Sequence, residues 1–316
     1  MEDYFADPIF VESHAKEAEC IRSVKKIDPR ICVYFIDQIA PAQLAKSQVI
    51  VTNNIVSNNL PIVAKIVRTS DSFYGMYYVP YTWHNTTVKK DFNCFINRMD
   101  PIRQSWFYQL IRRGLLHKGY VSFNMDVSRG ENLDANLSPT EVFEQQFITQ
   151  LSIFQKEHDV AKTIVPYKNF TEADDFDLAP VVLSSKFSII LETYFNNNDI
   201  VTWSEKTFRC LQLPRPWLLF GPAHAVKHLR NMGFDVLDDI CYHNNYDHIE
   251  NGIERQVKIL DRAQAMCNID ITPLMPRLEK AAKHNQKLLS SWYDSFDVDF
   301  KNTLENAREQ KNGLYK

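Results

Sequence analysis

The feature that most constrains the fold is a series of short apolar runs separated by stretches with helical spacing. Such runs are typical of strands buried on both faces of a parallel sheet. In the first half they are Ile31–Asp37, Val49–Thr52, Ile62–Val67, Phe92–Asn97 and Tyr120–Asn124. Between the last two runs, Asp100–Lys118 carries an apolar helical stripe, so this stretch predicts a strand–helix–strand unit.

The alternation continues in the second half of the chain. Phe187–Leu191 and Pro216–Phe220 are predicted strands, while Thr202–Leu211 and Ala223–Met232 are predicted helices. Gly233 directly follows the second helix and suits the residue that ends it. Strands that alternate with helices in this way indicate an α/β protein.

Longer helical patterns close the chain, at His248–Asn268 and Pro273–Ser295, and the charged tail is expected to be helical too. The acidic stretch Asn169–Asp177 lacks periodicity and predicts a loop or a crossing between domains. We therefore expect two domains, residues 1–170 and residues 171–316, each Rossmann-like and facing a central cleft.

Composition limits the function classes. The chain has 316 residues, 45% hydrophobic and 24% charged, so it can bury sizeable cores. Its net charge of −3 argues against binding nucleic acid with the whole surface, although a local basic groove remains compatible. Neither an apolar signal core nor a membrane-spanning run occurs, which predicts a cytoplasmic protein without membrane contact. Oligomeric state is not indicated.

Six scattered cysteines form no CxxC pair, so a zinc site is unsupported and buried thiols in a reducing compartment are expected. Asp175–Asp177 and Asp297–Asp299 match an Asp-x-Asp pattern, in which two carboxylates after a strand can hold a metal ion. Neither follows a convincing strand. We expect no bound cofactor and no catalytic metal, with positive protein groups acting in its place.

The segment from Thr202 to Pro222 carries the clearest chemistry. A helix that begins near Thr202 and Ser204 directs unpaired N–H groups and a positive dipole end toward the carboxyl ends of the strands, where ligands bind. Lys206 would add a full positive charge there, and the Glu205 carboxylate can accept ribose hydroxyls.

The order of motifs resembles the C-terminal donor motif of fucosyltransferase-like enzymes with the GT-B fold. It consists of Lys186–Phe195, then Thr202–Arg209, then Pro216–Pro222 with Gly221 in its final turn. Across roughly residues 90–260 the chain is also similar to phage-encoded relatives. Further segments carry that likeness, namely Phe92–Arg98, Arg103, Gly119–Phe123, Asn231–Asp235, Tyr246–Asp247 and Arg255.

This resemblance implies a GT-B-like fold with C-terminal helices and a nucleotide-sugar-dependent glycosyltransferase that uses a UDP- or GDP-sugar. It also implies that Glu205 contacts the ribose and Lys206 the phosphate, with Thr202, Ser204 and Gly221 beside them. A structural reading stands next to it, because Thr202 and Glu205 match a capping box and Lys206 would then be an ordinary solvated lysine.

Other side chains complete the hypothesis. Arg98 follows a predicted strand and offers a planar guanidinium suited to a second phosphate contact. Asp37, Asp126 and Glu192 lie at or just past strand ends and are candidate general bases for deprotonating an acceptor hydroxyl. Each of the three also fits a helix cap or a surface polar residue, and Glu192, which follows the Phe187–Leu191 strand, additionally fits a residue that faces the donor sugar or base.

Three hypotheses about function follow, of which the first two differ in the acceptor. The first is a hydroxymethylated pyrimidine in phage DNA, contacted by the basic residues Lys89, Lys90 and Arg103. The second keeps the enzyme class and takes a glycan or lipopolysaccharide as acceptor. The third, from another class, is a non-catalytic module that binds a nucleotide or sugar.

Overall fold

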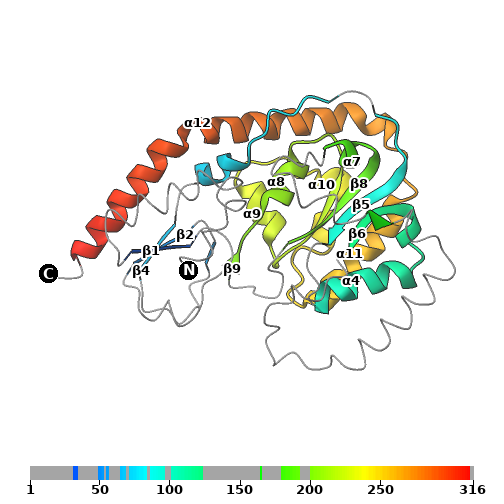
Figure 1. Cartoon of the computed structure of the whole chain (residues 1–316), viewed down its shortest axis with the longest axis horizontal. Coiled ribbons are helices and arrows are strands. Elements are labelled where there is room, and N and C mark those ends of the chain that lie inside the picture. The colour runs from blue at the N-terminus through cyan, green and yellow to red at the C-terminus, as the bar shows by residue number, and fades with distance from the viewer. Residues whose placement is uncertain are drawn as a thin grey trace.

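The computed structural model describes residues 31–34, 49–52, 55–56, 65–68, 71–83, 86–96, 101–123, 164–165, 179–192 and 200–313. Their main feature is a five-stranded sheet in which every pairing is parallel (Figure 1). Its strands are β5 (Lys90–Ile96), β6 (Gly119–Phe123), β7 (Ile164–Val165), β8 (Ser185–Leu191) and β10 (Trp217–Phe220). The predicted α/β class is therefore confirmed.

The order of these strands across the sheet is β10-β8-β5-β6-β7. The chain starts at the central β5, moves outward through β6 and β7, and then returns to the other side of β5 with β8 and β10. This is the order of a doubly wound, Rossmann-like sheet. The direction of winding reverses between β5 and β8, and open α/β sheets bind their ligands in a crevice beyond the carboxyl ends of the strands at such a reversal. We refer to this position as the crevice.

The described residues also form two smaller sheets. A parallel sheet has the order β1-β2-β4, and an antiparallel pair joins β3 to β9. Their bounds are β1 (Ile31–Tyr34), β2 (Val49–Thr52), β3 (Ile55–Val56), β4 (Lys65–Arg68) and β9 (Ile200–Val201). The β3–β9 pair ties the first part of the chain to the segment just before the predicted donor motif.

The main sheet spans the predicted domain boundary at residue 170. β7 precedes that boundary and β8 follows it, yet both strands belong to one sheet. The hydrophobic pattern correctly indicates which segments are strands. It carries no signal for the sheet that each strand joins, because a buried parallel strand has the same composition in any sheet.

Helices surround the main sheet with bounds close to those predicted. Gly233 follows α9 with a φ of 96°, the left-handed conformation expected of a residue that ends a helix. The helices are α4 (Pro101–Arg112), α7 (Ala179–Leu183), α8 (Glu205–Leu211), α9 (Ala225–Asn231), α10 (Asp238–Cys241), α11 (Gly252–Met266) and α12 (Met275–Gly313). The 3₁₀ turns are η2 (Asp71–Tyr77), η3 (Leu116–Lys118), η6 (His243–Asn245) and η7 (Thr272–Leu274).

The helix α12 has 39 residues and runs along the outside of the molecule, from the main sheet to β2 and β4 (Figure 1). It packs closely on η2. A Cβ atom added to Gly75 would lie 2.3 Å from the Tyr293 backbone nitrogen, so only glycine permits this approach. α12 therefore links the small parallel sheet, through β2 and β4, to α8, which packs against β8 of the main sheet.

A row of aromatic side chains joins η2, α8 and α12. Phe208 of α8 stacks on Tyr74 with ring centroids 4.8 Å apart, and on Tyr77 at 5.2 Å. Phe208 also contacts Phe234 at 5.9 Å, and Phe234 meets Trp292 of α12 edge-on at 5.2 Å. Aromatic pairs at these distances add to the free energy gained by burying the rings. They anchor α8 on its inner side.

The four described cysteines, Cys94, Cys210, Cys241 and Cys267, are buried free thiols, as predicted. Burial raises the pKa of the Cys210 and Cys241 thiols to about 12, so both stay protonated and unreactive at neutral pH. Within the described ranges, no helix has the length and apolar character needed to cross a membrane.

A buried histidine, His243, is connected to β10 through the Tyr246 hydroxyl. His243 is wholly buried, its Nδ1 lies 2.5 Å from the Tyr246 hydroxyl, and its Nε2 lies 2.9 Å from the Val236 carbonyl oxygen. The Tyr246 oxygen in turn accepts the Leu219 N–H of β10 at 3.2 Å. Burial lowers the pKa of His243 to about 4 from its ordinary value of 6.5. The ring is therefore neutral in the native protein at neutral pH.

This arrangement predicts an acid-sensitive fold. Below pH 6.5 the unfolded chain protonates His243, whereas the native chain resists until about pH 4, so the free energy of unfolding falls as pH decreases across that window. Urea unfolding should lose about 2 kcal/mol from this group between pH 7.5 and pH 5. His243→Gln should flatten the dependence and the exposed control His248→Gln should not; identical slopes in both variants would contradict the assignment.

Candidate functional site

The crevice between β5 and β8 brings together residues from four elements. α4 begins at Pro101, shortly after the carboxyl end of β5, and Glu192 directly follows β8. Ligands of open α/β sheets bind beyond the carboxyl ends of the strands at such a reversal of strand order. Because α4 has 12 residues, its N-terminus also supplies a positive dipole end and unpaired N–H groups.

Glu192 is the centre of this arrangement and is 1% exposed. Its backbone N–H donates to the Phe220 carbonyl oxygen of β10 at 2.9 Å. Its carboxylate oxygen Oε1 accepts the Ser204 N–H at 3.0 Å and the Thr207 hydroxyl at 2.5 Å. Its own carbonyl oxygen accepts Nη2 of Arg103 at 3.2 Å. One residue thus connects β8 with β10, α4 and the start of α8.

Arg103, predicted to contact a DNA acceptor, is 5% exposed and lies in the first turn of α4. Its guanidinium group is directed into the crevice, where it bonds the Glu192 backbone. The burial of this side chain argues against the predicted surface contact with DNA. The sequence pattern does not predict this burial, because an arginine in the first turn of a helix is expected on the solvent-exposed face.

Two buried hydroxyl groups precede α8. Thr202 is 3% exposed and Ser204 is 6% exposed, yet neither Thr202 Oγ1 nor Ser204 Oγ has a hydrogen-bond partner in the described part of the chain. Buried polar atoms in native proteins are nearly always paired. A polar ligand or an ordered water molecule bound at this turn would complete the hydrogen bonding of both hydroxyls.

The capping-box interpretation of this segment is wrong. α8 begins at Glu205 with Ser204 as the residue before it, and the Ser204 side chain makes no capping hydrogen bond. Glu205 is consequently the first helical residue, whereas a capping box needs the acidic side chain at the third position. The Thr202 hydroxyl likewise has no partner that would make it a cap.

Glu205 and Lys206 face outward from the first turn of α8. Their side chains are 37% and 20% exposed, and Lys206 Nζ lies 3.9 Å from Glu205 Oε1. An ion pair at that distance and exposure contributes little to stability. Lys206 also lines a small pocket of about 20 Å³ over β8, with room for one water molecule. The ion pair therefore leaves Lys206 able to turn to a ligand at small cost.

Gly221 follows β10 and lies next to Glu192. A Cβ atom on Gly221 would meet the Glu192 Cβ at 3.8 Å and the Ala225 Cβ at 3.5 Å, both ordinary contacts. Packing therefore does not require glycine at this position. Close approach of a ligand to the backbone stays the prediction for it.

The N-terminus of α9 is already occupied by an internal carboxylate. Asp247 accepts the N–H groups of Val226 and Lys227, each at 2.9 Å, and is 6% exposed. The Tyr246 hydroxyl oxygen accepts the Leu219 N–H of β10, and Arg255 donates to the carbonyl oxygens of Ile249 and Glu250. Tyr246, Asp247 and Arg255, which carry part of the sequence resemblance, therefore stabilise the scaffold.

Lys89 and Lys90 lie at the wrong end of the sheet for the predicted acceptor contact. Lys90 begins β5, and six residues of strand separate it from Ile96 at the crevice, a span of roughly 20 Å. Its ammonium group donates to the His117 carbonyl oxygen at 2.9 Å. The two lysines therefore lie too far from the crevice to contact the reacting group of an acceptor, and their contact with a more distant part of a DNA acceptor stays a prediction.

Several predicted residues cannot be placed. Arg98, Asp37 and Asp126 lie outside the described residues, as does the Asp175–Asp177 pattern. Asp297 and Asp299 lie within α12 and not after a strand. The described ranges contain no group of three or more His, Cys, Asp and Glu side chains arranged to hold a metal ion.

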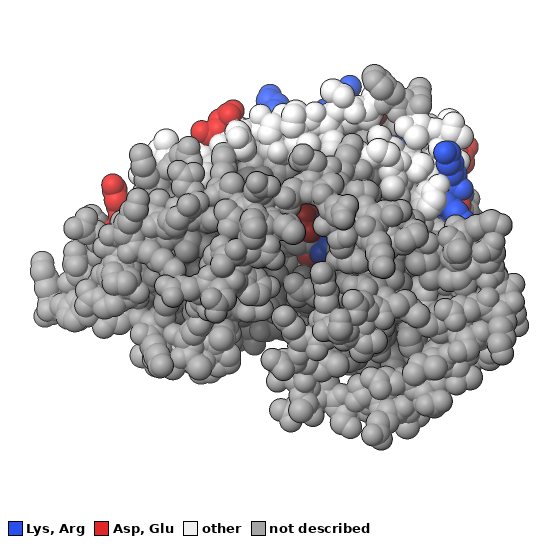
Figure 2. Space-filling view, in the orientation of Figure 1, with Lys and Arg blue, Asp and Glu red and all other residues white. Residues whose placement is uncertain are grey.

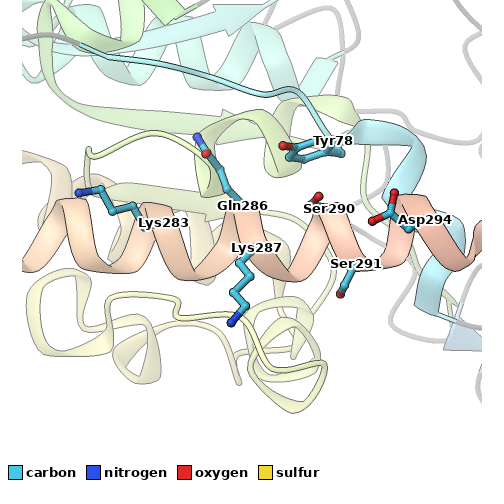
Figure 3. Close-up of a pocket in the computed structure, with 7 residues that line it drawn as sticks. All are labelled: Tyr78, Lys283, Gln286, Lys287, Ser290, Ser291 and Asp294. Atoms are coloured by element: carbon cyan, nitrogen blue, oxygen red, sulfur yellow. The ribbon is translucent and has the colours of Figure 1, made fainter.

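A second hollow lies along α12, with a volume of about 460 Å³. Figure 3 shows that Tyr78 and residues of successive helical turns line this groove, but none of the predicted site residues do. Along the edge that α12 forms in Figure 2, acidic and basic side chains of the described residues are interspersed, so this edge offers no patch of one sign. The groove is therefore a weaker candidate for the functional site than the crevice.

Comparison of the chain with protein-family models, curated proteins and solved structures gives no match. Function is therefore inferred from the residues at the crevice and from the sequence motifs that surround it.

The orphaned hydroxyls predict separate effects on stability and binding. Thr202→Val keeps the side-chain shape and removes an unpaired buried hydroxyl, so thermal unfolding should show unchanged or increased stability. Binding of a nucleoside diphosphate, measured by calorimetry, should weaken. Thr303→Val is the matched control, since the Thr303 hydroxyl is paired with the Asp299 carbonyl oxygen at 2.9 Å. Destabilisation by Thr202→Val with unchanged affinity would contradict the assignment.

Proposed function

We propose that this chain is a nucleotide-sugar-dependent glycosyltransferase whose donor diphosphate lies in the crevice between β5 and β8. The observation that carries the proposal is the pair of buried, unpartnered hydroxyls on Thr202 and Ser204. They immediately precede Glu205 and Lys206, at the point of the sheet where doubly wound proteins bind nucleotides. A ligand that supplies hydrogen-bond partners there would remove the cost of burying both groups.

The electrostatics of the crevice suit a diphosphate leaving group. The N-terminus of α4 contributes its dipole, and Lys206 contributes a full positive charge from the other side. Negative charge builds on the diphosphate as the bond to the sugar breaks, and fixed positive groups stabilise that transition state. Glu205, next to Lys206 on the outer face of α8, is proposed to accept the ribose hydroxyls. Catalysis without a metal ion is part of this proposal.

The proposed architecture is GT-B-like. The Rossmann-like sheet would hold the donor, and the parallel sheet of β1, β2 and β4 would form part of the acceptor side. The contacts of α12 with β2 and β4, together with the β3–β9 pair, support this arrangement. In this view the two halves meet over the crevice, and the acceptor hydroxyl approaches from the N-terminal half.

For the acceptor we propose a hydroxymethylated pyrimidine in DNA, on the similarity to phage-encoded relatives. Arg103 is buried against the Glu192 backbone, which argues against one of the contacts expected for DNA. Lys89 and Lys90 are proposed to contact a part of the DNA at the opposite end of β5 from the crevice. A glycan or lipopolysaccharide acceptor is the alternative within the same enzyme class. A non-catalytic nucleotide- or sugar-binding module is the alternative outside it.

A transfer assay tests the proposal. Purified protein is incubated with labelled UDP- and GDP-sugars and, in separate reactions, with hydroxymethylated duplex DNA or free glycans. We expect transfer from one donor class to the DNA. Transfer to a glycan alone would replace the acceptor, whereas donor binding without transfer to any acceptor would favour the non-catalytic module.

Lys206→Ala should lower turnover by about 10²-fold or more, the order expected when one group that stabilises the leaving charge is removed. The protein should still fold, because the lysine side chain is partly exposed and its ion pair is weak. Lys258→Ala, on the exposed face of α11, is the matched control and should retain full turnover. Equal activity of both variants would refute the donor-site assignment.

A further inference from the structure

We propose that Glu192 is a positioning residue of the donor site, whose buried carboxylate fixes the turn that presents Glu205 and Lys206. This inference rests on the proposed function. It replaces the expectation that Glu192 is a general base.

The two residues that donate hydrogen bonds to the carboxylate flank the proposed donor-binding residues, Glu205 and Lys206, in the sequence. Ser204 donates its backbone N–H from one side of the pair, and Thr207 donates its hydroxyl from the other side. Ser204 and Thr207 are buried, while Glu205 and Lys206 between them are partly exposed. Binding the two flanking residues to the end of β8 therefore orients the intervening side chains outward.

Glu192 also fixes this turn relative to the rest of the crevice. Its backbone is bonded to Phe220 at the end of β10 and to Arg103 in the first turn of α4. The distance between Lys206 and the N-terminus of α4 is therefore set through a single residue. A diphosphate bound between these two positive groups would depend on that distance.

A role as general base fits this environment poorly. A base must approach the acceptor hydroxyl to within about 3 Å, directly or through one water molecule. Glu192 is 1% exposed and its Oε1 already accepts two hydrogen bonds. Its carboxylate faces the turn before α8, on the donor side of the crevice.

Three variants separate positioning from proton transfer. In Glu192→Gln the amide oxygen can still accept the bonds from Ser204 and Thr207, but the group cannot act as a base. Glu192→Leu removes both bonds, and Thr207→Val removes only one. Glu254→Gln, an exposed residue of α11, is the control for loss of a carboxylate.

We expect Glu192→Gln to keep kcat and donor KM within about threefold of the wild type. Glu192→Leu should raise donor KM by about tenfold or more, because a buried donor then lacks its partner, with a smaller fall in kcat. Thr207→Val should lie between them. A loss of about 10²-fold or more in kcat for Glu192→Gln, with KM unchanged, would show a general base and overturn the inference.

Hydrogen exchange tests the same inference without any transfer reaction. Amide protection of residues 204–211 should fall in Glu192→Leu and Thr207→Val, stay at the wild-type level in Glu192→Gln, and be unchanged in α11 throughout. If the wild type transfers no sugar but this pattern is found, the proposed function fails and the positioning of the turn stands. Unchanged protection in residues 204–211, or an equal loss in α11, would overturn the inference. If Glu192→Leu does not fold, Thr207→Val decides the result.

Discussion

The reversal of strand order between β5 and β8 is the constraint on which the rest of the structure depends. Because the chain winds outward from β5 in both directions, the strand order reverses at the position where open α/β sheets bind their ligands. α4 leaves β5 on one side, and the segment that carries Thr202, Ser204 and α8 follows β8 on the other. Every residue that we assign to donor binding within the described part of the chain lies near these strand ends or near the end of β10.

The short helix α8 is held from two sides. On its inner side, Phe208 packs within the aromatic row that reaches from η2 to α12. On the side of the sheet, the Glu192 carboxylate binds the residues that flank its first turn. A seven-residue helix gains little stability from its own hydrogen bonds, so these tertiary contacts determine its position. The same contacts make α8 a rigid support for a ligand, which reduces the entropy lost on binding.

Much of the fold could be predicted from the sequence, and its limits have physical causes. The apolar runs identify the strands, and Gly233 ends α9 as expected, because burial and backbone conformation leave local signals. The sharing of one sheet across residue 170 leaves no such signal. In the candidate site, the sequence indicates Thr202–Lys206 from their order. It does not show that Glu192 binds this turn or that Arg103 is buried, because both facts depend on contacts between residues far apart in the chain. Glu192 directly follows a buried strand, and this was the only local sign of its importance.

The most direct test of the account is a crystal structure of the protein with UDP or GDP bound. The account predicts that the diphosphate lies between the N-terminus of α4 and Lys206, with the hydroxyl of Thr202 or Ser204 within hydrogen-bond distance of the nucleotide. Glu205 should then contact the ribose. A nucleotide bound in the groove along α12, or a crevice in which both hydroxyls stay unpaired while nucleotide binds elsewhere, would contradict the assignment of the crevice as the donor site.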